Sequence, residues 1–534
     1  MSNYYTVEKH IQILIALLKF HGIKKVIASP GVRNVCFVGS IQNDPFFEIY
    51  SSVDERSAAY IACGLAAESG EPVALTCTGS TASRNYASGL TEAYYRKLPV
   101  LAITATRHLG KVGNSVEQVI DRSVQMKDMV CKSIQLEEVH TRRQEKAAAL
   151  EINKALIALR RNGGGPVHIN LVANFNSDFS VRELPKVKGI RYTDSLSNMP
   201  AIDGYRKIAI LAGTSRSYDD RLTQAIDKFC EQYGAVVLSD PTSGYKGSHG
   251  VNHAVFSSFS SDFLPDDLKA DLVISIGSFV LFPTGMDPEN CQMWRIQPYG
   301  EISDNEGMLS HVFEIEECLF FEYYTGIDAG KANAECSDYY NIFHNAYVNA
   351  IDIAKELPYS NIWCASNLLP LISKDSKYHV LDSDTVSSWL YFDTDKSVRC
   401  CFHNSFLSKE GQSAALIGAS KAVPERTHFA ICSGDMLPHL SFIANEQLDS
   451  NIRLIVINDA KSDGTAEKFA ADNGCEYIVA KDKDEFLSTA DHFVDPDVSG
   501  KSMVFEIMID KELDKEALIE LHNQMEDALK TSVI

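Results

Sequence analysis

The stretch VDERSAAYIACGLA, residues 53–66, decides the first part of the fold. A strand-like run from residue 46 to residue 53 ends at an acidic pair, and a helix follows it. Small side chains in that helix allow another backbone to approach closely; they are Ala58, Ala59, Ala62, Gly64, Ala66 and Ala67. Glu55 is therefore expected at the carboxyl end of a strand, where α/β sheets bind ligands. The alternative is a solvated turn, since acidic side chains are mostly exposed.

Three further strand-like segments around this stretch also end in turns. Residues 26–28 run into Ser29-Pro30-Gly31, and residues 72–77 run into Thr78-Gly79-Ser80-Thr81. Residues 98–103 run into Thr104-Ala105-Thr106-Arg107. The alternation of short apolar strands with helices predicts a parallel, doubly wound sheet whose turns meet at one edge.

The ordered set of these motifs, from residue 26 to residue 107, resembles the pyrimidine-binding domain of the thiamine-diphosphate (ThDP) dependent 2-oxoacid decarboxylase superfamily. Within it, the set is similar to the menaquinone-pathway synthases of 2-succinyl-5-enolpyruvyl-6-hydroxy-3-cyclohexene-1-carboxylate (SEPHCHC synthases). The resemblance implies that Glu55 bonds the cofactor's aminopyrimidine and promotes its imino tautomer, which suits a buried carboxylate acting as acid and base. It also implies cofactor contacts at Thr78, Gly79 and Ser80, and substrate contacts at Ser29, Arg33, Arg107 and Gln118.

Composition limits the possible classes. The chain of 534 residues is too long for one core, so two to four domains are expected. A formal net charge of −21 argues against nucleic acid or an anionic membrane as partner. No secretory pattern or membrane-spanning apolar run is evident. The 13 cysteines are scattered without a metal-binding spacing, so we expect reduced thiols and a cytoplasmic location.

The periodicity along the chain predicts an α/β protein of three consecutive doubly wound parallel-sheet domains. The expected limits are residues 1–185 for a pyrimidine-binding domain, 200–330 for a central domain and 350–534 for a diphosphate-binding domain. Residues 112–139 are polar, and helices are expected there.

In the third domain, a diphosphate and a Mg²⁺ ion require backbone amides and hard oxygen ligands. By resemblance, the strand at 428–432 leads into the cofactor-binding residues Gly434, Asp435 and Met436, with Ser408 as a further contact. Expected metal ligands are Asp435, then Asn458 or Asp459 after the next strand, and the carbonyl of Lys461. The alternatives are a helix cap for Asp435 and a turn for the Asn-Asp pair.

This half also departs from the family pattern. The segment 461–464 passes almost directly into a helix, where SEPHCHC synthases have a longer substrate-covering segment. Glu410 aligns with an apolar residue that supports the bent cofactor, a role that Phe406 or Leu407 could take. Ser387 and Ser405 stand where substrate-binding arginines are expected.

The resemblance implies a homodimer or homotetramer, with sites shared between subunits, that decarboxylates a 2-oxo acid and transfers the product to an acceptor. The departures favour a different oxo acid or acceptor. One alternative is a simple ThDP-dependent decarboxylase or lyase. The other is a relative of the fold that has lost catalysis and acts as a binding protein.

Overall fold

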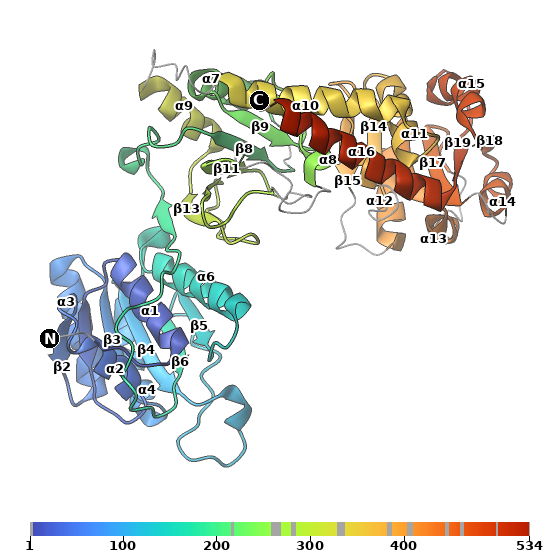
Figure 1. The fold of residues 1–534 in the computed structure, drawn as a ribbon. Helices are drawn as coiled ribbons and strands as arrows, with labels where there is room; N and C mark the ends of the chain where they lie inside the picture. The colour runs from blue at the N-terminus through green and yellow to red at the C-terminus, as the bar shows by residue number, and fades with distance from the viewer. Residues whose placement is uncertain are drawn as a thin grey trace. The chain divides into compact units, whose positions relative to one another are not determined.

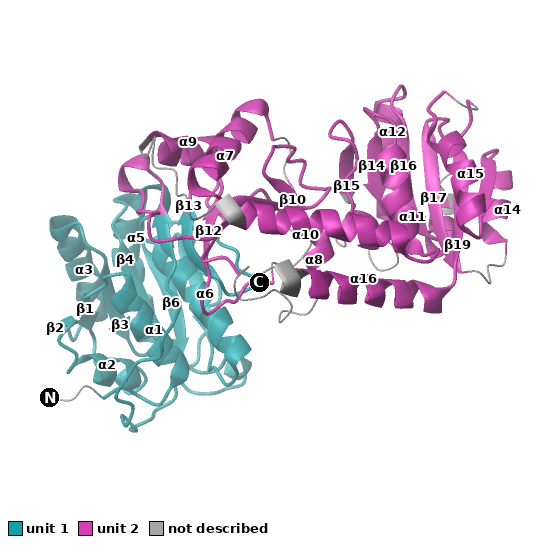
Figure 2. Ribbon diagram, turned by 45° about the horizontal axis from the view of Figure 1, so that its top comes forward, with its two compact units in different colours: residues 1–192, 302–312 teal, residues 193–301, 313–534 magenta. Residues whose placement is uncertain are grey.

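The computed structural model describes residues 4–214, 218–257, 269–278, 285–327, 337–381, 387–402, 409–443, 448–459, 464–497 and 500–532 (Figure 1). Two compact units make up the chain (Figure 2). The first comprises residues 1–192 and 302–312, and the second comprises residues 193–301 and 313–534.

The first unit is built on a six-stranded sheet of order β2-β1-β3-β4-β6-β5, in which all neighbours are parallel. Its strands are β1 (Lys25–Ala28), β2 (Glu48–Ser51), β3 (Val73–Cys77), β4 (Val100–Thr106), β5 (Lys132–Leu136) and β6 (Val167–Val172). Its helices are α1 (Lys9–Phe20), α2 (Val35–Ile41), α3 (Glu55–Ser69), α4 (Thr81–Asn85), α5 (Ala87–Tyr95) and α6 (Arg142–Ala158). The inner strands β3, β4 and β6 are buried along their whole length, as expected for parallel strands covered on both faces.

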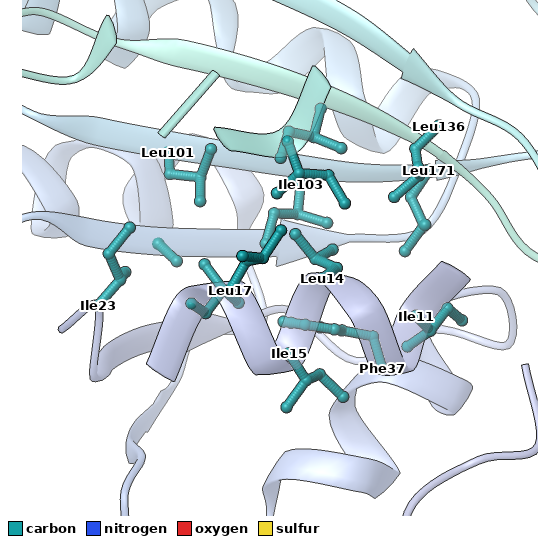
Figure 3. Packing of buried hydrophobic residues seen from close by; sticks show 14 of the residues in the cluster. Ile11, Leu14, Ile15, Leu17, Ile23, Phe37, Leu101, Ile103, Leu136 and Leu171 are labelled. Carbon is teal, nitrogen blue, oxygen red and sulfur yellow. The ribbon is translucent and has the colours of Figure 1, made fainter. Parts of the chain in front are cut away.

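Two hydrophobic clusters cover the two faces of this sheet. One face packs against α1, α2 and α6, and Leu14 and Leu17 of α1 lie against Leu101 and Ile103 of β4 (Figure 3). The other face packs against α3 and α5. Side chains alternate along β4 between the two clusters, because successive strand residues point to opposite faces.

Helix α3 forms as its sequence predicts. The Asp54 carboxylate caps it by accepting a hydrogen bond of 2.7 Å from the Ser57 backbone N–H, and Gly70 ends it in the left-handed conformation. A Cβ at Gly89 of α5 would lie 2.4 Å from Ala59 Cβ. The small residues of α3 therefore allow α5 to approach closely.

The second sheet has seven strands in the order β10-β9-β8-β11-β12-β13-β7. These are β7 (Arg191–Thr193), β8 (Ile208–Ala212), β9 (Val236–Ser239), β10 (Gly250–Asn252), β11 (Leu272–Ile276), β12 (Gln292–Ile296) and β13 (Leu309–Phe313). The helices in this part are α7 (Asp220–Tyr233), α8 (Ala254–Ser257), α9 (Glu317–Ile327) and α10 (Ser337–Glu356). Aromatic side chains dominate the core between α7, α9 and the sheet, with Phe229, Phe320 and Phe321 fully buried.

The third sheet has six strands in the order β15-β14-β16-β17-β19-β18, all parallel. These are β14 (Lys377–Val380), β15 (Arg399–Phe402), β16 (His428–Ser433), β17 (Ile452–Asp459), β18 (Glu476–Ala480) and β19 (Met503–Ile509). The helices are α11 (Asn361–Leu368), α12 (Lys409–Ala422), α13 (Leu437–Ile443), α14 (Thr465–Asp472), α15 (Lys483–Val494) and α16 (Lys511–Ser532).

The α/β fold class, with three parallel sheets in chain order, is confirmed. The limits 1–185, 200–330 and 350–534 remain predictions, since most of the second sheet lies in one compact unit with the third sheet. The prediction of helices in residues 112–139 is wrong. This segment holds strand β5 and irregular backbone, with a short 3₁₀ turn at Leu109–Lys111 just before it.

Candidate active site

The turns after β1, β3 and β4 meet at the carboxyl edge of the first sheet. A Cβ at Gly31 would lie 2.5 Å from Thr78 Cβ, so the turn after β1 rests directly on the turn after β3. A Cβ at Gly79 would lie 2.9 Å from the carbonyl oxygen of Ala105 and 3.8 Å from that of Gln118. The two glycines therefore let three chain segments approach at backbone distance.

Two of the six described non-glycine residues with positive φ belong to these segments. Ser80 has φ 59° and ψ −131°, and Gln118 has φ 55°, although neither residue is glycine. Such conformations cost on the order of 1–3 kcal/mol each and are retained mostly at functional sites. The strain thus supports a functional role for two of the residues that the sequence predicts.

Glu55 is the first residue of α3, and its side chain is half-buried. Its carboxylate influences two buried groups, the Cys77 thiol at the end of β3 and the Tyr86 hydroxyl. Burial raises the pKa of Cys77 to about 12, and the negative charge of Glu55 adds to this increase. Burial likewise raises the pKa of Tyr86, again with a contribution from Glu55. Glu55 is therefore near two buried groups that are neutral.

Arg33 and Arg107 follow β1 and β4 at this edge. Burial lowers the pKa of Arg33, and the nearby positive charge of Arg107 lowers it further, so the two guanidinium groups lie close together. The Nε atom of each is buried without a hydrogen-bond partner among the described residues. The Ser29 hydroxyl, on a residue only 1% exposed, interacts with the buried Tyr86 hydroxyl. Two neighbouring cations and orphaned donors are suited to binding a carboxylate.

Arg122 lies beside these segments, and sequence reasoning missed it. It is 3% exposed, and its Nη2 donates a hydrogen bond of 2.8 Å to the Ala105 carbonyl, beside Gly79. Burial lowers its pKa to about 10. The polar segment that carries it gave no signal of burial.

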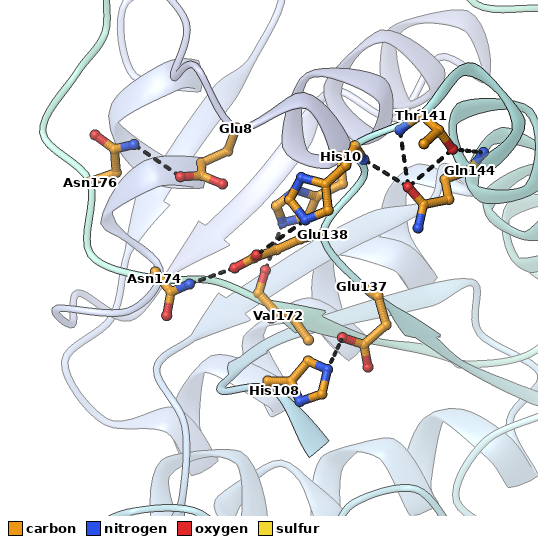
Figure 4. Close-up of polar contacts among 11 residues, drawn as sticks. Glu8, His10, His108, Glu137, Glu138, Thr141, Gln144, Val172, Asn174 and Asn176 are labelled. Carbon is orange, nitrogen blue, oxygen red and sulfur yellow. Dashed lines mark hydrogen bonds and ion pairs between the residues drawn. The ribbon is translucent and has the colours of Figure 1, made fainter. Parts of the chain in front are cut away.

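At the outer part of this edge, after β5 and β6, polar side chains form hydrogen bonds with other residues of the first unit (Figure 4). Glu138 accepts a hydrogen bond of 2.5 Å from Asn174, and Glu8 accepts one of 2.9 Å from Asn176. His10 donates from Nε2 to the Val172 carbonyl at 2.7 Å. These contacts tie α1 to the strand ends, so this part of the edge has a structural role.

The turn after β16 is the corresponding place in the third sheet. Gly434–Met436 form a 3₁₀ turn, in which Asp435 is exposed and Met436 is fully buried in the core of this sheet. Met436 can therefore offer a ligand its backbone only. A Cβ at Gly434 would lie 2.5 Å from Asn458 Oδ1, so the glycine makes room for that amide.

Asn458 and Asp459 end β17, which pairs with β16. Asn458 Nδ2 donates a hydrogen bond of 2.7 Å to the buried Glu506 carboxylate. Asp459 instead forms an ion pair with Lys511 of α16 at 3.4 Å. The structure thus brings Gly434, Asp435 and Asn458 together and turns the Asp459 carboxylate toward a lysine.

Several residues that the sequence predicts at the third-sheet site cannot be placed there from the described part of the chain. Ser408 and Lys461, together with Phe406, Leu407 and Ser405, lie outside the described residues. Glu410 lies in the first turn of α12, but its side chain is not among those described. Ser387 is half-buried at the start of the 3₁₀ turn Ser387–Leu390.

The residues present fit ThDP in two respects. The first-sheet edge offers the half-buried Glu55 carboxylate near the buried, neutral Cys77 and Tyr86. In the third sheet, Gly434 lets the Asn458 amide lie against the turn that carries Asp435. No group of three or more His, Cys, Asp or Glu side chains that could hold a metal occurs in the part of the chain that the structure describes. Mg²⁺ bound to phosphates needs only one or two protein carboxylates, so Asp435 with the Asn458 amide is a sufficient protein contribution.

Among the described helices, none combines the length and apolar character needed to cross a membrane.

Comparisons with known proteins found one matching family and several similar relatives. Residues 9–126 match the family described as thiamine pyrophosphate enzyme, N-terminal TPP binding domain. The chain is 24% identical to the 2-succinyl-5-enolpyruvyl-6-hydroxy-3-cyclohexene-1-carboxylate synthase of Phocaeicola vulgatus, over 98% of this chain and 99% of the relative. The synthase of Bacteroides thetaiotaomicron is also 24% identical over 98% of this chain and 99% of its own length. That of Porphyromonas gingivalis is 29% identical over 53% of this chain and 50% of the relative.

Proposed function

Because this chain is an enzyme of the thiamine-diphosphate-dependent type, we propose that it binds ThDP with Mg²⁺, decarboxylates a 2-oxo acid and transfers the product to an acceptor. The observation that carries this proposal is the placement of Glu55 at the start of α3, beside the strained turn at Ser80. The relatives named SEPHCHC synthase cover nearly the whole chain, which supports the same class of reaction.

ThDP, when bound, supplies the electron sink for decarboxylation. Glu55 holds or moves a proton at a ring nitrogen of the aminopyrimidine, and its half-buried position limits competition from water. Thr78, Gly79 and Ser80 form the wall of backbone against which the ring would lie.

Arg33 and Arg107 orient the carboxylate of a substrate, since each presents a guanidinium group at the same edge. Ser29 and Gln118 are further substrate contacts in this proposal. Asp435 and Asn458 are the metal ligands that the described geometry favours, with Gly434, Met436 and Ser408 toward the diphosphate and Lys461 as an additional ligand.

The assembly proposed is a homodimer or homotetramer in which each site combines the first-sheet edge of one subunit with the third-sheet edge of its partner, as the resemblance implies. A cytoplasmic location is proposed as well, and the described cysteines support it because all of them are free thiols.

The test is donor-dependent release of CO₂ by the Mg²⁺–ThDP enzyme. The donor that the resemblance to SEPHCHC synthases implies, 2-oxoglutarate, is compared with pyruvate, 2-oxobutyrate and phosphonopyruvate in the presence of isochorismate, the acceptor that it implies. Ser387, in a position where the family pattern has arginine, favours a donor smaller or less charged than 2-oxoglutarate. A strong preference for 2-oxoglutarate would indicate that the protein uses the same donor as the SEPHCHC synthases. Release of CO₂ without use of the acceptor would instead indicate a simple decarboxylase, and no binding of ThDP would contradict the proposal.

A further inference from the structure

A buried carboxylate lies behind the Asn458 amide in the third sheet. Glu506 of β19 is 2% exposed, and its Oε1 accepts the hydrogen bond of 2.7 Å from Asn458 Nδ2. Its Oε2 accepts a hydrogen bond from the Tyr477 hydroxyl of β18. Strands β17 and β18 flank β19, so the three side chains form one chain of hydrogen bonds across neighbouring strands.

The hydrogen bond to Glu506 determines which end of the Asn458 amide faces Glu506. A carboxylate only accepts hydrogen bonds, whereas an amide has one donating and one accepting end. Asn458 must therefore turn Nδ2 toward Glu506, and its Oδ1 points to the other side. On that side lies Gly434, whose Cβ, if present, would be closer to Oδ1, at 2.5 Å, than to Nδ2, at 3.1 Å.

Strand geometry separates Asn458 from its neighbour. Successive side chains of a strand point to opposite faces of the sheet, so only one member of the pair can face the turn at Gly434. Asp459 points toward Lys511, with Oδ2 and Nζ 3.4 Å apart. Asn458 is thus the residue of β17 whose oxygen faces the Gly434-Asp435 step.

We infer that Glu506, braced by Tyr477, is a positioning residue that holds the Asn458 carbonyl oxygen toward Asp435 as a Mg²⁺ ligand. This inference rests on the proposed function and deepens it. A purely structural pair is a weak explanation for the buried polar contact, because an apolar pair of similar size is often as stable. A residue behind a ligand that fixes its orientation typically changes metal affinity about 10–100-fold when it is mutated.

The test uses the near-isosteric variant Glu506→Gln, with Mg²⁺ titrated by calorimetry in the presence of saturating ThDP. Tyr477, whose hydroxyl donates to Glu506, sets the orientation of the glutamine. The glutamine oxygen then accepts from Tyr477 and its Nε2 donates to Asn458 Oδ1, which would turn the metal-binding oxygen away. We expect Mg²⁺ affinity to fall about 10–100-fold, while the melting curve followed by circular dichroism shows a folded protein.

The reversed pair, Asn458→Asp combined with Glu506→Gln, provides the decisive second variant. In it, the introduced glutamine donates to one oxygen of the introduced aspartate, and the other oxygen of that aspartate is left facing Asp435. Mg²⁺ affinity should therefore return toward that of the wild type. Tyr477→Phe is the matched control, because it removes one donor to Glu506 and keeps the Asn458 bond; its effect should be smaller than that of Glu506→Gln.

The outcomes separate the two proposals. If the wild type binds Mg²⁺ with ThDP and Glu506→Gln binds it equally tightly, the positioning role is overturned and the proposed function stands. If Glu506→Gln binds Mg²⁺ more weakly and the reversed pair does not restore the Mg²⁺ affinity, the positioning role is likewise overturned. The direction of the hydrogen bond between residues 458 and 506 is then not the cause of the loss. If the wild type shows no Mg²⁺-dependent binding of ThDP, the proposed function itself fails.

Discussion

Replacing Gly434 by alanine should damage both the stability and the cofactor site of the third sheet. The added Cβ would lie 2.5 Å from Asn458 Oδ1 and 2.9 Å from its Cγ, well inside the ~3.5 Å of an ordinary van der Waals contact. The amide must move, and its hydrogen bond to Glu506 is lost. Losing a hydrogen bond to a charged group costs about 1.5–3 kcal/mol, and overpacking adds about 1–3 kcal/mol. Together they lower the free energy of unfolding by about 2.5–6 kcal/mol.

The assay is urea denaturation of the apoprotein together with titration of ThDP at fixed Mg²⁺. Gly418→Ala is the matched control, since Gly418 lies in α12 and an added Cβ there meets nothing within 4 Å. The free energy of unfolding of that control should rise by roughly 0.5–1 kcal/mol, because alanine is the better helix former. Unchanged stability and unchanged ThDP affinity in Gly434→Ala would refute the placement of Asn458 against Gly434.

Three further predictions concern the site and the first sheet. Asp435→Ala should weaken ThDP binding in calorimetry and be partly rescued by excess Mg²⁺; an unchanged titration would remove Asp435 from the metal site. Arg33→Ala and Arg107→Ala should each raise the KM for an acidic donor, by a loss of about 1.5–3 kcal/mol per charged hydrogen bond, and leave a neutral analogue unaffected. Burial lowers the pKa of His168 from 6.5 to about 3, so the unfolded state takes up a proton first as the pH falls. Unfolding free energy should then decrease between pH 6.5 and about 3, by up to about 1.4 kcal/mol per pH unit, and His168→Gln should flatten this dependence.

Much of the first sheet could be predicted because local signals agree with the fold. Apolar runs such as residues 73–77 are bounded by Gly and Ser turns, and α3 has both its Asp54 cap and its Gly70 end in sequence. Residues 112–131 could not be predicted in the same way. Their polar composition suits exposed helices, whereas Arg122 is buried against the Ala105 carbonyl. Tertiary contacts between distant segments decide that position, and they leave no local pattern.

The second half of the chain shows the same limit. The Gly434-Asp435 step and the Asn458-Asp459 pair were visible in the sequence, but which member of the pair faces the glycine was not. That choice depends on strand orientation and on Glu506 and Tyr477, which are far from Asn458 in the chain. The two-unit division was not predicted either, since helix α10, Ser337–Glu356, spans most of the stretch between the expected limits 330 and 350.

The most direct test of the central claim is the rate at which the C2 proton of ThDP exchanges with deuterium on the enzyme, measured by NMR after acid quench. With Glu55 as the acid and base at the aminopyrimidine, the wild type should accelerate exchange strongly over free ThDP. Glu55→Gln should bind ThDP and lose about 10²–10⁴ of that rate, the usual contribution of such a group. Exchange in Glu55→Gln at the wild-type rate, or no acceleration by a wild type that binds ThDP, would contradict the account.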